Sequence, residues 1–220
     1  MTRLILASTS PYRAQLLARL GLEFTTAAPR VEETIAADEP PASAAARLAL
    51  EKARAVARTA AAPGSAGRSA EPGTAAAEKR AVARTLVIGA DQVPARRGEI
   101  LRKPGSHADT IAQLTRCAGE TVVFYTAAAV VDAASGEAWQ SVDETEVEFA
   151  ELTRAQIERY VELERPYDCA GGFRVEGLGI ALFRAVRSSD PTGLIGLPLI
   201  WLAATLRRAG LDPLAAASSR

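Results

Sequence analysis

The sequence predicts an α/β fold in which a mixed, twisted β-sheet is flanked by helices. Short β-rich apolar runs alternate with amphipathic stretches along the chain, which indicates alternating strands and helices. The alternation has no strict strand–helix–strand period and includes a hairpin through residues 134–137, so we expect a mixed sheet. With 220 residues, 48% of them hydrophobic, the chain can bury one good core, which predicts a single domain over residues 1–220.

The N-terminal part predicts a strand followed directly by a helix. Residues 4–7 form a short apolar run that is typical of a buried strand. A helix should follow over residues 11–20, because Ser10 is a favourable N-cap and Gly21 favours a helix end. A second helix is expected from about Ser43, with apolar positions at Ala46, Leu48, Leu50 and Ala53.

Residues 59–83 differ from the rest of the chain in composition. They are rich in Ala, Gly, Ser and Pro and poor in large apolar side chains. Such a segment cannot bury enough surface to offset the entropy that is lost when it becomes ordered. We therefore expect a low-complexity insertion on the surface that has no catalytic role.

The second half of the chain predicts the remaining strands and helices. Strands are expected over residues 85–93, over 121–132 and from Trp139, with helices over 108–117 and 152–165, then a Gly-rich loop, a last strand and a closing helix. Asp91 falls at the tip of the first of these strands, where open α/β sheets tend to place functional groups.

The composition favours a small charged ligand over a polymer. The 26 Lys and Arg residues balance the 26 Asp and Glu residues, so no overall basic field attracts a nucleic acid or an anionic membrane. No apolar run reaches the roughly 20 residues of a membrane helix, and the N-terminus lacks the pattern of a secretory signal. We therefore expect a cytoplasmic protein with no membrane and no nucleic-acid partner.

The stretch Ser8-Thr9-Ser10-Pro11 ends a strand and opens a helix, which is an arrangement that can hold an anion. Free N–H groups and the positive end of the helix dipole attract negative charge there. Ser8 and Ser10 add hydroxyl donors, and Arg13 can bind two phosphate oxygens at once. The same residues would also suit an ordinary capped helix with a solvated Arg.

Separated carboxylates are candidates for metal binding and acid–base chemistry. Glu32 and Glu33 stand in an expected loop, and Asp91 stands at a strand end. Magnesium-dependent phosphate chemistry needs such hard oxygens, either as metal ligands or as a base for water. The plainer interpretations are a surface acidic pair and a turn-capping Asp. Lys52 and Lys103 could complete a basic lining, although each alone is more commonly a solvated charge.

The remaining motifs give little support to other chemistries. The Gly-rich residues 171–179 lack the strand and helix that frame a dinucleotide-binding loop. His107 is the only histidine and has no nucleophile placed beside it by any motif, and Cys117 and Cys169 lack the partners of a zinc site. Glu176 in the Gly-rich loop could read a base edge or a positive charge, and a surface Glu is the plainer interpretation.

Together these motifs resemble the Maf family, the septum-formation-inhibitor-like nucleotide pyrophosphatases. The resemblance spans almost the whole chain, in the family's order, and rests on LILASTSPYRAQLL, AAPRVEET, LALEKA, IGADQV, LRKPG, FYT, YDCAGGFRVEGLGIALF and GLPLIWLAATLRRAG. It implies a two-lobed architecture with a cleft, similar to that of the inosine triphosphate pyrophosphatases. The main departure from the family pattern is the insertion at residues 59–83.

The resemblance implies hydrolysis of a nucleoside triphosphate between its α and β phosphates. It also implies a divalent cation, Mg²⁺ with Mn²⁺ as the alternative, and suggests a homodimer. Asp91 falls on the position of the proton acceptor that activates water, and Glu33 on the acidic position associated with the metal. The phosphate-binding candidates are Ser8, Ser10, Arg13, Lys52 and Lys103.

Three positions distinguish the branches of the family. The common branch, which acts on dTTP and UTP, has Arg, Thr and Gln where this chain has Tyr12, Gln92 and Glu176. The combination here resembles the YceF-like branch, which acts on 7-methyl-GTP. Tyr12 could stack on the positive ring of a methylated guanine, Glu176 could match its charge, and Gln92 could bond another base edge. The alternatives are hydrolysis of dTTP, UTP or a broader set of noncanonical nucleotides, and a non-enzymatic nucleotide-binding regulator of septum formation.

Overall fold

The computed structural model describes residues 2–61 and 84–216. Most of the insertion predicted over residues 59–83 lies outside these described residues. Residues 59–61 are described, and they form the end of helix α2 (Pro41–Ala61). Within the described ranges, every helix is too short or too polar to span a bilayer.

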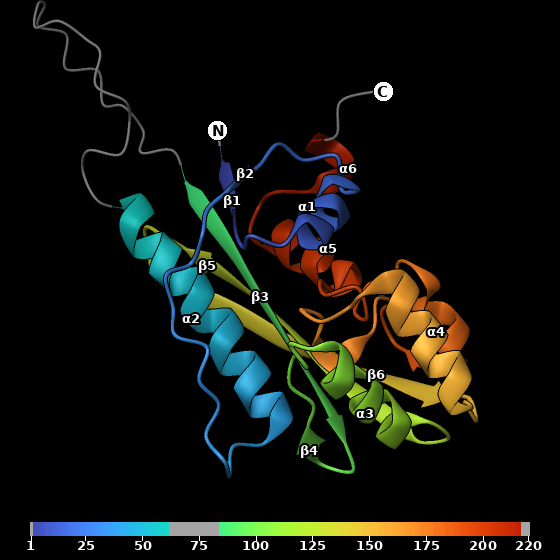
Figure 1. Ribbon diagram of the computed structural model, residues 1–220. Coiled ribbons are helices and arrows are strands. Elements are labelled where there is room, and N and C mark those ends of the chain that lie inside the picture. The colour runs from blue at the N-terminus through green and yellow to red at the C-terminus, as the bar shows by residue number, and fades with distance from the viewer. Residues whose placement is uncertain (1, 62–83, 217–220) are drawn as a thin grey trace, which may run out of the picture.

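A mixed sheet organises the described part of the chain (Figure 1). From edge to edge its strands are β2 (Thr25–Thr26), β1 (Arg3–Ala7), β3 (Thr85–Arg96), β5 (Thr121–Asp132), β6 (Ala138–Phe149) and β7 (Phe183–Ser188), and β4 (Glu99–Ile100) pairs with β3. β1 is parallel to β2 and β3, and the other pairs are antiparallel. The predicted mixed α/β sheet, with its hairpin between β5 and β6, is confirmed.

The helices surround this sheet. Besides α2 they are α1 (Pro11–Ala18), α3 (His107–Cys117), α4 (Arg154–Glu164), α5 (Leu199–Arg208) and α6 (Pro213–Ala216), with short 3-10 helices η1 (Ala170–Gly172) and η2 (Leu178–Leu182). Ser10 caps α1 as predicted. Helix α2 begins at Pro41, before the predicted Ser43, because proline suits the first turn of a helix. Its inward face is built mainly from Ala44, Ala45, Leu48, Ala49 and Ala53, whereas the predicted apolar positions Ala46 and Leu50 are half-buried.

Asp91 lies in the middle of β3 and not at a strand tip, which corrects the sequence-based prediction. β3 continues to Arg96 because it pairs with β5 along its whole later length, with Asp91 opposite Ala127. Its other neighbour, β1, stops at Ala7, opposite Gly89. The edge of β3 beyond Gly89 is therefore not covered by β1, and this leaves space for a site beside Asp91.

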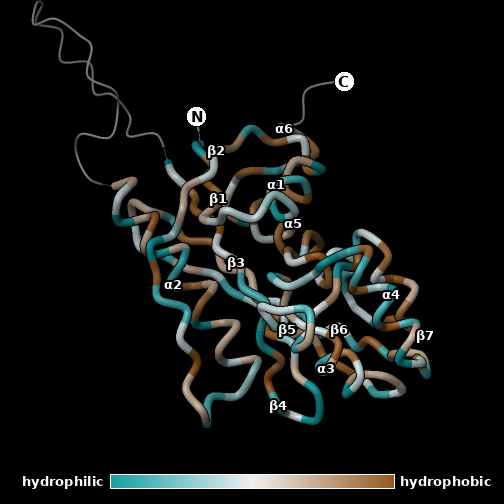
Figure 2. Tube along the Cα trace, in the orientation of Figure 1, coloured by the Kyte–Doolittle hydropathy of each residue, from teal (hydrophilic) through white to brown (hydrophobic). Residues whose placement is uncertain are grey.

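Successive residues of β3 face opposite layers of helices, as the pleat of a strand requires. Leu86 and Ile88 pack with α1 and α5, whereas Val87 and Val93 pack with the small residues of α2. Figure 1 shows α2 on one side of the long strands and α1 and α5 on the other. Figure 2 shows hydrophobic and hydrophilic residues alternating along α2 and α4, which is typical of helices with one buried face.

A second lobe forms around the far ends of the three long strands. There α3 and α4 pack on β5 and β6 around a separate apolar cluster that includes Phe124, Phe149 and Phe173. These aromatic rings meet edge to face, with centroids 5.2 Å apart for Phe124 and Phe173 and 5.6 Å apart for Phe149 and Phe173. β3, β5 and β6 run through both lobes and hold them in one body (Figure 1). The predicted two-lobed architecture is confirmed.

Gly89 allows α2 to lie directly on β3. A Cβ atom at Gly89 would stand 2.1 Å from the carbonyl oxygen of Ala49 and 2.7 Å from the amide nitrogen of Ala53. Because both of these are backbone atoms, they could not move aside without moving the helix. Lys52 lies between these two alanines in the sequence, and Asp91 follows Gly89 on the same face of β3, so this contact sets the separation of the two side chains.

Replacing Gly89 by Ala should push α2 away from β3. We expect the variant to lose about 1–3 kcal/mol of unfolding free energy, the usual cost of overpacking, and to lose activity as Lys52 moves away from Asp91. Urea unfolding measures the first effect, and an assay of the nucleotide hydrolysis that the family resemblance implies measures the second. The control is Gln140→Ala, at an exposed position of β6. Stability and activity like those of the unchanged protein in Gly89→Ala would contradict this account.

Candidate active site

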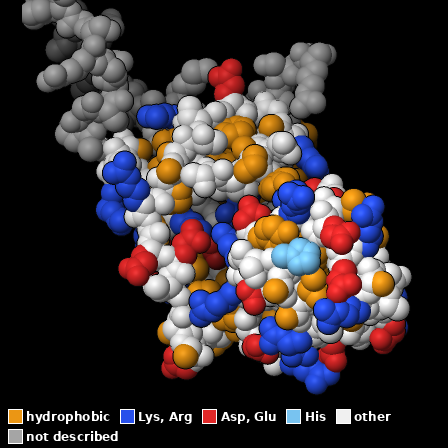
Figure 3. All heavy atoms as spheres, in the orientation of Figure 1, with side chains coloured by type: hydrophobic (Ala, Val, Ile, Leu, Met, Phe, Trp, Pro, Cys, Tyr) orange, Lys and Arg blue, Asp and Glu red, His pale blue; other side chains and the backbone are white. Residues whose placement is uncertain are grey.

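A cleft of about 680 Å³ opens between the two lobes, beside the part of β3 that β1 leaves uncovered. Its volume is within the usual range for small-molecule sites. Figure 3 shows acidic and basic side chains side by side around a hollow between α2 and the lobe that carries α3. The structure brings every site residue predicted from the sequence to this cleft: Ser8, Ser10, Tyr12, Arg13, Glu33, Lys52, Asp91, Gln92, Lys103 and Glu176.

The centre of the cleft is a buried ammonium group shared by two carboxylates. Lys52 Nζ lies 2.5 Å from Asp91 Oδ1 and 2.6 Å from Glu33 Oε1. The side chains of Lys52 and Asp91 are only 5% and 10% exposed, whereas that of Glu33 is 54% exposed. Since a buried charge is costly unless it is paired, each partner makes the burial of the other tolerable.

Lys52 lies on the apolar face of helix α2. This face packs against β3, and the packing brings Lys52 to Asp91. Lys52 follows Leu48 and Ala49 at helical spacing, so its stem lies in the same buried row as these residues. The Lys52 ammonium then meets β3 two residues beyond the close contact at Gly89. A lysine inside an otherwise apolar helical row is a sequence signal that favours a buried, partnered charge over a solvated one.

Glu33 comes from the loop between β2 and α2, which is fastened to α2. Arg47 donates hydrogen bonds from Nη2 to the carbonyl oxygen of Thr34 at 2.9 Å and from Nε to Glu39 Oε1 at 2.7 Å. Desolvation tends to raise the pKa of Glu33, but the hydrogen bond and charge of Lys52 and the charges of Lys103 and Arg13 outweigh it and lower that pKa. Glu33 therefore stays ionised at neutral pH.

The start of α1 forms a second wall, rich in hydrogen-bond donors. The Ser8 hydroxyl oxygen accepts from the amide of Ser10 at 3.1 Å, and the Ser10 hydroxyl oxygen accepts from the amide of Arg13 at 3.4 Å. Arg13 Nε donates to the carbonyl oxygen of Gly196 at 2.9 Å. Burial lowers the pKa of Arg13, while the charges of Asp91 and Glu33 oppose that shift. Arg13 thus shares its surroundings with both carboxylates of the central cluster.

Lys103 reaches the cleft from the other lobe. It is exposed, and it stands in the segment between β4 and α3 just before Pro104 and Gly105. The φ angle of Gly105 is +74°, a conformation that favours glycine, and its amide donates to the carbonyl oxygen of Tyr167 at 2.9 Å. Lys103 lines the same cleft as Glu33, and its positive charge helps to lower the pKa of Glu33.

The remaining predicted residues line the end of the cleft near the Gly-rich loop. Tyr12 is half-buried and lines the cleft together with Arg174. Desolvation raises the pKa of Glu176, and the charge of Arg174 opposes that rise. Gln92 Nε2 donates to Thr126 Oγ1 at 2.9 Å and lies 3.2 and 3.0 Å from the carbonyl oxygens of Gly193 and Leu194.

Sequence reasoning missed several side chains that also line the cleft. They are Arg102, Asp168 and Arg174, together with Cys169, which was considered only as a zinc ligand. Arg174 stands two residues before Glu176 in the Gly-rich loop and lines the same cleft, and its buried Nε atom has no hydrogen-bond partner among the described residues. A basic residue two positions from a singled-out Glu was the signal that could have found it.

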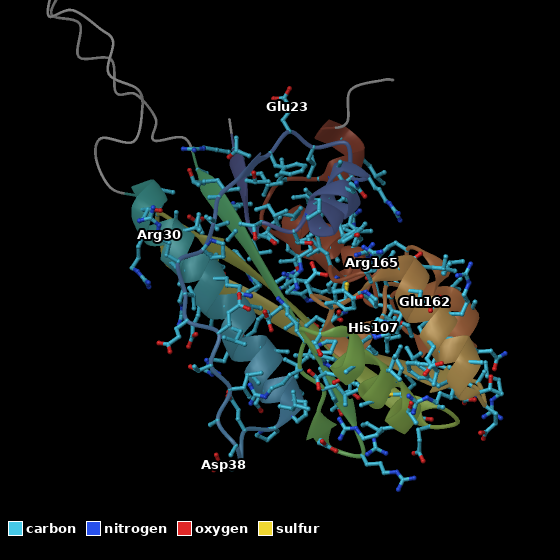
Figure 4. The ribbon with its side chains drawn as sticks, viewed as in Figure 1. Glu23, Arg30, Asp38, His107, Glu162 and Arg165 are labelled. Carbon is cyan, nitrogen blue, oxygen red and sulfur yellow. The ribbon has the colours of Figure 1, made fainter. Side chains whose placement is uncertain are left out.

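Two residues considered at first lie outside the lining. Glu32 is exposed and does not line the cleft. Figure 4 shows His107 at the start of α3, near Arg165 at the end of α4. The cap of α3 is Ser106, and His107 contacts the Tyr167 ring edge to face with centroids 6.5 Å apart. His107 is therefore a surface residue of the second lobe.

The carboxylates of Glu33 and Asp91 suit a metal ion that binds together with a substrate. Among the residues that the structure describes, no group of three or more His, Cys, Asp and Glu side chains is placed to hold a metal ion. The carboxylates of Glu33 and Asp91 do converge on one ammonium group. Mg²⁺ is commonly bound by one or two carboxylates, with substrate phosphates and waters completing its shell.

Comparisons with known proteins agree on the family. A family model described as Maf-like protein matches residues 3–209. A protein of Xanthomonas oryzae pv. oryzae named 7-methyl-GTP pyrophosphatase is 48% identical over 96% of this chain and 98% of its own length. Proteins of the same name from Albidiferax ferrireducens and Nitrosococcus oceani are each 44% identical, over 97% and 94% of this chain and 96% and 93% of their own lengths.

The crystal structure of a nucleoside-triphosphatase, dITP/XTP pyrophosphatase, from Mycobacterium abscessus is a more distant match. It is 18% identical over 69% of this chain and 76% of that chain, with a TM-score of 0.39, and this similarity is too low to support an argument. The family model and the close relatives, in contrast, cover nearly the whole sequence. The chain therefore belongs to the Maf-like protein family.

Proposed function

We propose that the protein is a nucleoside triphosphate pyrophosphatase that converts 7-methyl-GTP into 7-methyl-GMP and diphosphate, a house-cleaning role for a modified nucleotide. Relatives that are 44–48% identical over nearly the whole chain carry the name 7-methyl-GTP pyrophosphatase. The observation that carries the proposal is the buried pair of Asp91 and Lys52 in a cleft that other basic groups also line. We regard residues 1–220 as one catalytic unit, because the cleft takes residues from α1 as well as from the loop before α5.

Asp91 is the group that accepts a proton from the attacking water. Lys52 holds its Oδ1 atom at 2.5 Å, which fixes the carboxylate, while Oδ2 makes no hydrogen bond with any described residue and can face a water. The water oxygen attacks the α-phosphorus as its proton passes to Asp91, and the bond from that phosphorus to the bridging oxygen breaks. Diphosphate leaves with the bridging oxygen.

The groups around Asp91 bind the phosphates and stabilise the charge that develops on the leaving diphosphate. The N-terminus of α1 offers amide groups and the hydroxyls of Ser8 and Ser10. Arg13 uses Nε to hold Gly196, and its terminal nitrogens, which make no hydrogen bond with described residues, can bind two phosphate oxygens. Lys103 supplies a positive charge from the opposite wall, where a chain of phosphates could lie between the two lobes.

A divalent cation, Mg²⁺ or alternatively Mn²⁺, would bind through Glu33 together with phosphate oxygens. Such a cation supplies neutralising charge to the phosphates. Glu33 suits this role because its lowered pKa keeps it ionised and its side chain is half-exposed, so it can leave Lys52 for a cation. Asp91, being buried against Lys52, is less free to do so.

Tyr12 and Glu176 would recognise the methylated base. Methylation at N7 gives guanine a positive ring, and stacking on the Tyr12 face is worth up to about 2 kcal/mol in a desolvated site. Glu176 would add a negative charge or accept from the guanine edge. Unmethylated GTP lacks the positive ring, so it would lose these two charge contributions.

The direct test is diphosphate release by the purified protein with Mg²⁺ across 7-methyl-GTP, GTP, dTTP, UTP and ITP. We expect 7-methyl-GTP to be turned over fastest, and the rate to fall about 10²–10⁴-fold in Asp91→Asn, because a general base contributes that much. Faster turnover of dTTP and UTP would contradict the substrate proposal but not the catalytic one. Absence of turnover with every nucleotide would instead favour a nucleotide-binding regulator.

The base-recognition proposal makes a separate prediction. Tyr12→Ala should reduce the preference for 7-methyl-GTP over GTP by up to about 30-fold, the equivalent of 2 kcal/mol, and Glu176→Gln should reduce it further. Competition kinetics with the two nucleotides measures this ratio. The control is Glu23→Gln, because Glu23 points away from the body of the protein (Figure 4). An unchanged preference in both Tyr12→Ala and Glu176→Gln would overturn this role.

A further inference from the structure

We propose that Gln92 is a positioning residue, which shapes the base end of the cleft by holding residues 193–196, here called the 193–196 loop. Its link to base preference rests on the proposed function, whereas its hold on the loop rests on the contacts alone. The sequence suggested that Gln92 contacts a base edge directly. Its hydrogen bonds point to an indirect role.

Gln92 faces the layer of the sheet opposite to its neighbour Asp91. Asp91 shares the α2 face of β3 with Val87 and Val93, while Gln92 shares the other face with Leu86 and Ile88. On that other face Gln92 meets the loop that leads into α5. One strand therefore presents a catalytic carboxylate to one layer and a loop anchor to the other.

The amide donor of Gln92 is fully used inside the protein. An amide NH₂ group carries two hydrogens, and three acceptors already surround Nε2: Thr126 Oγ1 at 2.9 Å, the Leu194 carbonyl at 3.0 Å and the Gly193 carbonyl at 3.2 Å. No hydrogen remains to donate to a base. A nucleotide could compete for this donor only by breaking the bonds that hold the loop.

Other contacts also hold the 193–196 loop. The amide of Gly196 donates to the carbonyl oxygen of Gly193 at 2.8 Å, and Leu194 and Ile195 pack against the two apolar clusters. At one end the Asp190 carboxylate accepts from the amide of Thr192 at 2.9 Å and from the amide of Ile200 at 2.6 Å. At the other end the Gly196 carbonyl oxygen accepts from Arg13 Nε at 2.9 Å. Among the described residues, Gln92 supplies the side-chain hydrogen bonds to the carbonyl oxygens of Gly193 and Leu194, so its loss should loosen the loop there.

The loop forms a boundary that matters for the shape of the cleft. Leu194 and Ile195 line the main cleft and also a second, smaller hollow of about 330 Å³, together with Val175 and Glu176. Leu194 and Ile195 therefore border both hollows. If Leu194 shifts, the base end of the cleft widens toward the second hollow, and discrimination between bases should fall although the phosphate-binding groups remain in place.

The test is hydrogen exchange of the protein without nucleotide, so its result does not depend on the substrate. In Gln92→Glu, which keeps the size of the side chain but replaces the donor by an acceptor, we expect the amides of residues 193–197 to exchange about tenfold faster, because lost hydrogen bonds favour local opening. Gln92→Met removes the donor without adding a charge and should give the same result. Exposed Gln140→Glu on β6 is the matched control.

Kinetics then separate positioning from direct contact. In Gln92→Glu we expect KM for 7-methyl-GTP to rise about tenfold and the preference over GTP to fall, with kcat changed less than about threefold, because Asp91 lies on the other face. Unchanged loop exchange in both Gln92 variants would overturn the proposal. Loss of base preference with unchanged loop exchange would show that Gln92 reads the base itself. Faster loop exchange without turnover of any nucleotide would support the anchor and reject only the proposed function.

Discussion

The site depends on one buried ammonium group, that of Lys52, which is bound by two carboxylates at 2.5 and 2.6 Å. Asp91 can be buried on β3 because Lys52 balances its charge, and Lys52 can be buried on α2 because Asp91 and Glu33 balance its own. Removing Lys52 leaves both carboxylates without their partner, whereas removing either carboxylate leaves the ammonium group paired with the other one. The α2 helix, the β3 strand and the loop that carries Glu33 are therefore coupled electrostatically as well as by packing.

The backbone also makes the contact between Lys52 and Asp91 possible, independently of their charges. β1 stops opposite Gly89, which leaves the later part of β3 uncovered on that side, and Gly89 allows α2 to approach the strand closely. Because side chains alternate along β3, two neighbouring polar residues point to opposite faces of the sheet. Asp91 meets Lys52 in one layer, and Gln92 meets the 193–196 loop in the other. A short segment of one strand thus contacts both the proposed reacting centre and the loop at the proposed base end of the cleft.

Local patterns were enough to predict much of the fold. Ser10 followed by Pro11 predicted the start of α1, and apolar runs predicted the strands of the hairpin. The end of β3 was predicted wrongly because Asp91, Gln92 and Pro94 all disfavour a strand locally, whereas pairing with β5 over eleven positions overrides that preference. The start of α2 differed only because Pro41 can occupy a first helical turn.

The candidate site could be predicted in part, as a set of residues but not as an arrangement. Residue types and family motifs selected side chains that do line one cleft. They could not show that Lys52 would bridge Glu33 and Asp91, because the three positions are brought together only by the packing of α2 on the sheet. Likewise, Gln92 and Leu194 are about a hundred positions apart in the sequence, so no local pattern could indicate their hydrogen bond. Arg174 was missed because a single Arg in a Gly-rich loop is usually solvated.

The most direct measurement of the central interaction is the pKa of the Glu33 carboxyl group, followed by carbon-13 NMR in the unchanged protein and in Lys52→Met. The account predicts a pKa below the ordinary 4.5 in the unchanged protein and a higher one in Lys52→Met. Because folding lowers this pKa, the stabilisation that Glu33 provides is present above its unfolded pKa and is lost as the pH falls through the folded one. An ordinary Glu33 pKa in the unchanged protein, unaffected by Lys52→Met, would contradict the claim that Lys52 holds the site together.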